Sequence, residues 1–242
     1  MPGAVLATAL CTLGACAAAP HKDALHSRPE RPQMTVQLAP PDPGSAVAAD
    51  IALAKLVRDA GPAKALRDTA SKEATLFVPR PVFARDWLGR RDYRPAATAR
   101  REPHKVWISC DGSLALTTGS WTDAAGSGGW FLTAWERDKN GMWRWTLNEA
   151  ERSPDRAPPP GDIVATVASC EQLPPTAVAT VPVVGLWRGG GSHDGSLYWA
   201  ARVDPQCGRI LTVRMNGGAG AGFAEVVNRR IDPPRPAAAC NS

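Results

Sequence analysis

Residues 104–123 read HKVWISCDGSLALTTGSWTD, and this stretch decides the fold class. Apolar and polar residues alternate on both sides of Asp111-Gly112, a dipeptide that favours the tight turn of a β-hairpin. Residues 129–137 and 141–151 alternate in the same way and are separated by the turn residues 138–141. The sequence therefore predicts four consecutive antiparallel strands, at residues 104–110, 113–123, 129–137 and 141–151.

Helical patterns precede these strands. Ser45 is a candidate N-cap for a first helix. The apolar residues that recur with the spacing of one helix face are Val47, Ile51, Ala54 and Val57. Gly61-Pro62 ends this helix and begins a second, which runs to about residue 70 with Leu66 in its core. A strand is expected at residues 74–78, and a short helical segment at residues 81–88.

Beyond residue 160 the pattern is again that of strands, predicted at residues 163–169, 197–203, 209–215 and 223–230. Two proline-rich stretches contain too few apolar residues to bury a core and are typical of a tether and a linker. The predicted parts are a signal peptide (1–15), a tether (16–44), an α+β domain (45–151), a linker (152–160), a β-rich extension with a disulfide (161–232) and a tail (233–242). No internal repeat is evident.

Three short motifs accompany this order of elements: ATLFVP at residues 74–79, WISCDGSLA at 107–115 and NGMWRW at 140–145. With the element order, they resemble the nuclear-transport-factor-2-like superfamily, including its SnoaL-like and ketosteroid-isomerase-like members. The resemblance covers residues 46–151. It implies an α+β domain in which helices pack on a curved antiparallel sheet and enclose a cone-shaped pocket, here followed by a smaller β extension. Such a fold alone does not define an activity.

The first residues favour export. Residues 1–15 carry no charge and are too short a run to cross a bilayer as a helix, which needs about 20 residues. Leu13-Gly14-Ala15-Cys16 resembles the bacterial lipobox, which implies cleavage before Cys16 and lipidation of its thiol. No Lys or Arg precedes Lys22, which predicts a true start upstream of Met1. An ordinary cleaved signal and an untargeted hydrophobic N-terminus are the alternatives. We expect an outer-membrane lipoprotein facing the periplasm or, after ordinary cleavage, a soluble periplasmic protein.

Charge and cysteines fit an exported protein. The formal net charge is +5, which in an envelope protein favours contact with anionic lipid headgroups over nucleic acid. Apart from Cys11 and Cys16, four cysteines follow: Cys110, Cys170, Cys207 and Cys240. An even number in an oxidising compartment predicts disulfides, with three possible pairings and at least one bridge in the C-terminal region. No C-x-x-C or HExxH motif occurs, so neither a metal nor a cofactor is expected.

The resemblance implies two catalytic templates. Ketosteroid-isomerase-like sites combine an Asp base with a Tyr and a protonated Asp, and neither Tyr93 nor Tyr198 lies at a suitable place. SnoaL-like sites use an Asp and a His. His104 is the only histidine in the matched region, and Asp86 on the short helix is its candidate partner. A histidine at a strand end is more often a surface or capping residue than a catalyst.

Glu149 is the other candidate carboxylate. Strict alternation places it on one face with Trp143, Trp145 and Leu147. If it is buried there, its pKa is raised and it is a candidate proton acceptor or ligand anchor; at the strand end it lies in water instead. Most of the nine tryptophans are expected in the core. The candidate ligand-pocket residues are Trp87, Trp143, Trp145 and Glu149.

Two further stretches have mainly structural interpretations. Basic residues are dense between Arg85 and Lys105, which is typical of a solvated connection and, as an alternative, of a patch that contacts anions. Gly189-Gly190-Gly191 is followed by no helix, so it lacks the amide cradle of a phosphate-binding loop. A flexible hairpin turn is expected there.

The sequence thus predicts a lipid-anchored envelope protein whose cone-shaped domain binds a small apolar molecule or a partner protein without catalysis. The alternatives are a SnoaL-like acid/base enzyme that acts on a small apolar substrate through His104, Asp86 and Glu149, and a purely structural envelope protein. The expected partners are the membrane, through lipid at Cys16, and a small ligand, an envelope protein or a second copy of the chain. Nucleic acid is not expected.

Overall fold

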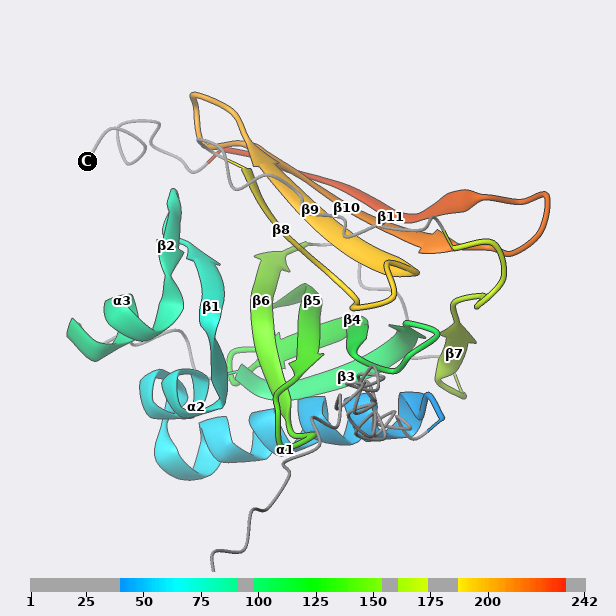
Figure 1. The fold of residues 1–242 in the computed structure, drawn as a ribbon. Coiled ribbons are helices and arrows are strands. Elements are labelled where there is room, and N and C mark those ends of the chain that lie inside the picture. The colour runs from blue at the N-terminus through cyan, green and yellow to red at the C-terminus, as the bar shows by residue number, and fades with distance from the viewer. Residues whose placement is uncertain (1–39, 91–97, 154–160, 174–186, 234–242) are drawn as a thin grey trace, which may run out of the picture. The chain divides into compact units, whose positions relative to one another are not determined.

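The structure, a computed structural model, describes residues 40–90, 98–153, 161–173 and 187–233 (Figure 1). All of these belong to one compact unit of the chain. The predicted signal peptide, Cys16, most of the tether, most of the linker, most of the tail and Cys240 lie outside the described residues. No described helix is long and apolar enough to cross a bilayer.

The described residues form three helices and eleven strands. The helices are α1 (Pro43–Ala60), α2 (Pro62–Thr69) and α3 (Ala84–Arg90). The strands are β1 (Ala70–Phe77), β2 (Pro81–Phe83), β3 (Thr98–Ile108), β4 (Leu114–Asp123), β5 (Gly128–Arg137), β6 (Trp143–Arg152), β7 (Val164–Val167), β8 (Trp187–Gly191), β9 (Leu197–Val203), β10 (Arg209–Asn216) and β11 (Phe223–Ile231). The four hairpin strands are confirmed as β3 to β6. Strand β8 occupies the glycine stretch for which we expected a flexible turn, and that interpretation is wrong.

The strands form two sheets. The larger has the order β2-β1-β6-β5-β4-β3-β7, and the smaller has the order β11-β10-β9-β8. The larger sheet is mixed, because β1 runs parallel to β6 and β7 runs parallel to β3. The smaller sheet is an antiparallel meander.

The predicted fold class, helices on a curved antiparallel sheet that enclose a cone, is therefore wrong. The described chain is mostly β-strand and has a seven-stranded mixed sheet and a second, four-stranded sheet. The smaller sheet is not an appendage, because it shares a hydrophobic core with the larger one. The strand β4 begins with the unbroken apolar run Leu114-Ala115-Leu116, which is typical of a strand covered on both faces.

Two cores separate three layers, namely the helices, the larger sheet and the smaller sheet (Figure 1). The core under the helices contains, from the sheet, Val106, Ile108, Ala115, Trp135 and Trp145. The core between the sheets contains Leu114, Leu116, Leu132 and Leu147 from the larger sheet and Leu197, Trp199, Leu211 and Val213 from the smaller one. Strands β3 and β4 thus send alternate side chains to opposite layers, as Val106, Trp107 and Ile108 do.

Helix α1 is rotated relative to our expectation. Its buried residues are Ala46, Val47, Asp50 and Leu53, whereas Ile51 is 55% exposed. The N-cap is Asp42, whose carboxylate accepts from the amide of Gly44 at 3.0 Å, and not Ser45. The rotation turns Asp50 toward the larger sheet, where Arg101 forms an ion pair with it.

Two matching turns join the sheets. Residues 109–114 read SCDGSL and residues 192–197 read SHDGSL, and each connects the first two strands of a four-stranded meander. The Asp111 amide donates to the Asp194 carboxylate (2.9 Å), and the Asp194 amide donates to the Asp111 carboxylate (3.0 Å). Gly112 and Gly195 both have positive φ, which glycine adopts without strain. Strands β3–β6 and β8–β11 thus both begin with a hairpin closed by the same Ser-X-Asp-Gly-Ser-Leu pattern.

The expected disulfide chemistry is confirmed. Cys110, in the first of these turns, is bonded to Cys170. Cys207 is also disulfide-bonded. The bridge from Cys110 closes a loop with a sequence separation of 60 and ties the chain after β7 to the turn between β3 and β4.

Candidate functional site

The candidate site lies where the ladder between β1 and β6 is interrupted. Ala70 pairs with Trp145 and Thr75 pairs with Leu147, so residues 71–74 lie opposite Thr146 alone. On the other side of β6, Trp135 pairs with Trp145 and Ala134 pairs with Leu147, which makes Thr146 the extra residue of a β-bulge. Bulges re-aim side chains and are frequent beside active sites. Both irregularities meet at Thr146 and separate β1 from β6.

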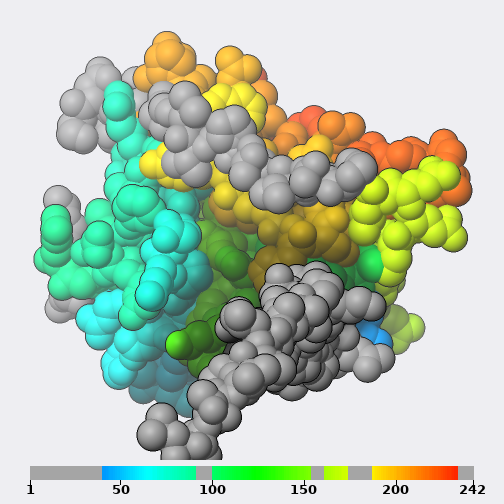
Figure 2. All heavy atoms as spheres, in the orientation of Figure 1, coloured from blue at the N-terminus to red at the C-terminus, as the bar shows by residue number. Residues whose placement is uncertain are grey.

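The interruption opens a cleft made of two adjoining hollows. The outer hollow has a volume of about 540 Å³ and the inner hollow about 300 Å³. Both are lined by Glu73 and Glu136. The outer hollow adds Ser71, Lys72, Arg85, Lys139 and Arg144, and the inner hollow adds Thr75, Phe83, Thr146, Arg188, Gly190 and Trp199. Figure 2 shows the cyan and teal atoms around β1 beside the yellow and orange atoms of the smaller sheet.

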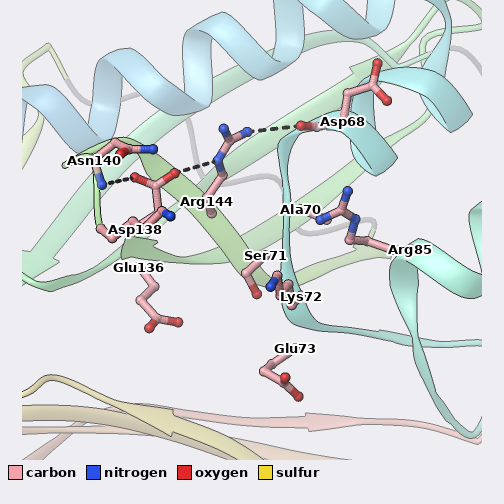
Figure 3. Close-up of a pocket in the computed structure, with 11 residues that line it drawn as sticks. Asp68, Ala70, Ser71, Lys72, Glu73, Arg85, Glu136, Asp138, Asn140 and Arg144 are labelled. Atoms are coloured by element: carbon pink, nitrogen blue, oxygen red, sulfur yellow. Dashed lines mark hydrogen bonds and ion pairs between the residues drawn. The ribbon is translucent and has the colours of Figure 1, made fainter.

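Glu136 and Glu73 are the two carboxylates that line both hollows. Both side chains extend toward the smaller sheet (Figure 3). Burial raises the pKa of Glu136, the charge of Glu73 adds to the rise, and His193 opposes it. The cross-strand partner of Glu136 is Arg144, which donates instead to the Asp138 carboxylate at 3.2 Å and also binds a backbone carbonyl on α2. Glu136 therefore faces the cleft without an arginine partner among the described residues.

Trp199 contributes a buried donor. Its side chain lines the inner hollow and is 2% exposed, and among the described residues its indole N–H has no hydrogen-bond partner. Trp199 of β9 pairs with Gly190 of the neighbouring strand β8. A Cβ added to Gly190 would stand 2.8 Å from the indole nitrogen. Glycine is therefore required at position 190 for the ring to lie over β8. A buried donor that stays unpaired costs about 1–3 kcal/mol, so the N–H is a candidate for a ligand contact.

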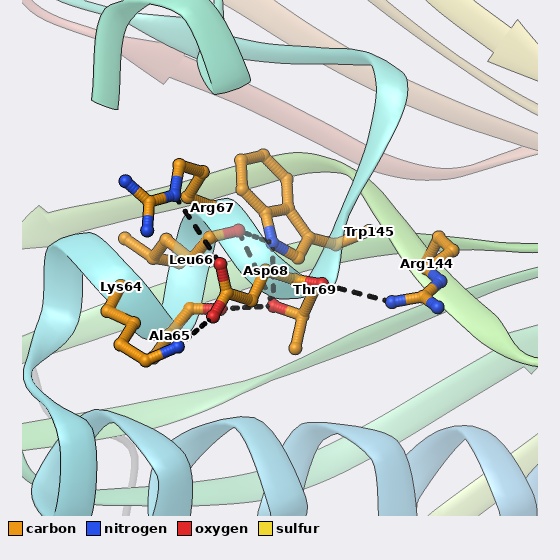
Figure 4. A network of polar contacts seen from close by, with 8 residues as sticks. All are labelled: Lys64, Ala65, Leu66, Arg67, Asp68, Thr69, Arg144 and Trp145. Carbon is orange, nitrogen blue, oxygen red and sulfur yellow. Dashed lines mark hydrogen bonds and ion pairs between the residues drawn. The ribbon is translucent and has the colours of Figure 1, made fainter. Parts of the chain in front are cut away.

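The predicted pocket tryptophans lie on the other face of the larger sheet. Trp145 is fully buried and donates to the Leu66 carbonyl at 3.0 Å, so it fixes α2 on the sheet (Figure 4). Trp143 donates to the Ser45 hydroxyl at 3.0 Å and so fixes the start of α1. Trp87 is half-buried against the core under the helices. These three side chains pack the helices against the sheet.

Glu149 is buried, as one of our two alternatives proposed, but its surroundings differ from those predicted. The bulge at Thr146 breaks the alternation, so Trp145 faces the helices while Leu147 and Glu149 face the smaller sheet. Two hydrogen bonds from Arg209 hold the carboxylate, one of them from Nε at 2.9 Å. Burial raises the pKa of Glu149, and the guanidinium opposes that rise. The expectation that Trp145 and Glu149 share a face is wrong.

The three catalytic candidates are not brought together. His104 is itself the extra residue of a bulge in β3, and its Nε2 lies 3.2 Å from the Ser120 hydroxyl. Burial lowers the pKa of His104, and Glu102 opposes the change. Asp86 is exposed on α3, and Glu149 is paired with Arg209. No acid/base pair among these residues has the contact that proton transfer requires.

A second buried polar cluster was missed by the sequence analysis. Asp50 is fully buried and lies 3.3 Å from Arg101, which also donates to the Thr133 hydroxyl at 2.7 Å and stacks on the Phe131 ring. Burial raises the pKa of Asp50, and Arg101 opposes the rise. At residue 101 our interpretation as a solvated connection is wrong. A signal was present, because Asp50 lies three residues from both Val47 and Leu53 and so interrupts an apolar helix face.

No three His, Cys, Asp or Glu side chains in the described part of the chain are grouped to hold a metal ion. No family model matches the chain, and the comparison with curated proteins found no match. The family resemblance of residues 46–151 therefore stays a prediction.

Proposed function

We propose that this chain is an exported envelope protein that binds a small polar molecule in the cleft between its two sheets. The proposal departs from the apolar ligand expected from the sequence, because carboxylates, hydroxyls and basic side chains are placed in walls whose remaining surface is apolar. Anchoring through Cys16 is part of the proposal and rests on the lipobox resemblance of residues 13–16.

The observation that carries the proposal is the unpartnered indole N–H of Trp199 beside a hollow of about 300 Å³. Small-molecule sites have volumes of ~300–1,000 Å³ and combine aromatic walls with a few placed polar groups. The Ser71 hydroxyl, buried without a partner in the described structure, is a second such group in the outer hollow. A ligand with hydrogen-bonding groups would satisfy both.

The test is a titration of the ¹⁵N-labelled full chain, followed through the tryptophan indole N–H resonances. The probes are glucose, glucosamine and glucuronate, three small hydroxylated molecules of different charge. Trp199→Phe assigns the resonance, because it removes the N–H and keeps an aromatic ring. We expect the Trp199 resonance to move saturably with at least one probe.

The matched control is Trp187, which lies at the start of β8, is 40% exposed and does not line either hollow. Its indole resonance, assigned with Trp187→Phe, is expected to stay in place. If none of the three probes moves the Trp199 resonance, or if both indoles move equally, the proposed site is wrong.

A further inference from the structure

We infer that the cleft selects a ligand that carries a protonated amine together with hydroxyl groups, as an amino sugar does. This inference rests on the proposed function. In it, the ammonium lies between Glu73 and Glu136, and an oxygen of the ligand accepts from the Trp199 indole.

The first step is the charge of the inner hollow. Glu73 and Glu136 both line it, and neither forms an ion pair within the described residues. Two carboxylates of like charge repel each other, which is why Glu73 raises the pKa of Glu136. A cation between them removes this repulsion and gains charge-assisted hydrogen bonds.

The second step concerns the basic groups that face Glu136. His193, from the turn between β8 and β9, is the one that lowers its pKa. Arg144, from β6, is bound to Asp138. Arg188, from β8, lines the inner hollow and brings one positive charge against the two carboxylates. The remaining basic residues of the cleft, Lys72, Arg85 and Lys139, line the outer hollow and not the inner one. The inner hollow therefore keeps an excess of negative charge.

The third step excludes a bare cation as the ligand. The indole N–H of Trp199 only donates, so it needs an acceptor, which an alkali ion or a simple ammonium ion does not supply. The hydroxyls of Thr75 and Thr146 line the same hollow and both donate and accept. A hydroxylated amine offers a cation to the carboxylates and oxygens to these groups.

The experiment compares the affinities of glucosamine, glucose and glucuronate for the full chain, at a pH between the pKa of Glu136 and that of the sugar amine. A charge-assisted hydrogen bond predicts that glucosamine binds about tenfold more tightly than glucose, with glucuronate weakest. Glu136→Gln keeps the shape of the side chain and is expected to remove this preference for glucosamine over glucose. Glu225→Gln, on the exposed strand β11, is the control and should retain the preference.

The outcomes separate the two proposals. If glucose or glucuronate binds as well as glucosamine and moves the Trp199 resonance, the amine selectivity is wrong and the proposed function stands. The same holds if Glu136→Gln retains the preference for glucosamine. If no probe binds, both proposals fail.

Discussion

The ion pair between Glu149 of β6 and Arg209 of β10 links the two sheets, and its removal tests how they are held together. The two side chains are 7% and 11% exposed, so solvent does not screen the interaction. Arg209→Met leaves the carboxylate buried without its partner. Breaking a buried pair in this way costs about 3–5 kcal/mol. This is a large share of the ~5–15 kcal/mol by which a folded domain is stable.

The assay is a double-mutant cycle by urea unfolding. In Glu149→Met/Arg209→Met both charges are replaced by apolar side chains, and we expect the double variant to unfold within ~1 kcal/mol of the wild type. The stability lost in the double variant should therefore be smaller than the sum of the losses in the two single variants. The exposed pair Lys55–Asp59 on α1 is the control, and Lys55→Met is expected to cause no resolvable change in stability.

The pH dependence gives an independent check. Burial raises the pKa of Glu149, and without Arg209 nothing in the pair opposes that rise. A carboxyl group whose folded pKa lies above its unfolded pKa destabilises the folded state when ionised. The loss of unfolding free energy caused by Arg209→Met should therefore be largest above the folded pKa of Glu149. It should shrink as the pH falls through that pKa. A cost below ~1 kcal/mol, or single-variant costs that simply add, would refute this account.

Four further predictions follow from the described contacts. Replacing Cys110 and Cys170 by serine should lower the free energy of unfolding by about 4 kcal/mol in urea, because the bridge closes a loop with a separation of 60. Gly190→Ala should cost ~1–3 kcal/mol and shift the facing indole resonance, since its Cβ would stand 2.8 Å from the ring nitrogen. Glu136→Gln should remove a loss of stability that the wild type shows as the pH rises from about 4.5 through the raised folded pKa of that residue. Labelled fatty acid should be incorporated into the wild type and not into Cys16→Ala; equal labelling of both would contradict lipid attachment there.

Local patterns predicted the hairpins well and the sheet order poorly. The turn at Asp111-Gly112 is set by residues adjacent in sequence, so its strands were placed correctly. The parallel pairings of β1 with β6 and of β7 with β3 join segments far apart in the chain, and no local pattern specifies them. Without these pairings, the sequence suggests a simple antiparallel sheet.

The site was missed for a related reason. A single extra residue at Thr146 moves every later side chain of β6 to the opposite face, and nothing in the alternating sequence marks it. Glu73, Glu136 and Trp199 come from three strands that meet only in the folded chain. The two Asp-Gly turns were visible in the sequence and predict two hairpins, but the hydrogen bonds between them appear only in the folded chain.

The position of the cleft follows from the way this second meander covers the first. Strand β8 is an edge strand of the smaller sheet. In the larger sheet, β1 follows β6 and separates from it at Thr146, and residues of β8 line the hollow at this place. At that edge β8 carries Gly189-Gly190-Gly191, which place no side chains in the space. Successive residues of a strand point to opposite faces, and at position 190 an added Cβ would stand 2.8 Å from the indole nitrogen of Trp199. The glycine stretch that first suggested a flexible turn therefore has a defined role at Gly190, which leaves room for the Trp199 ring beside the inner hollow.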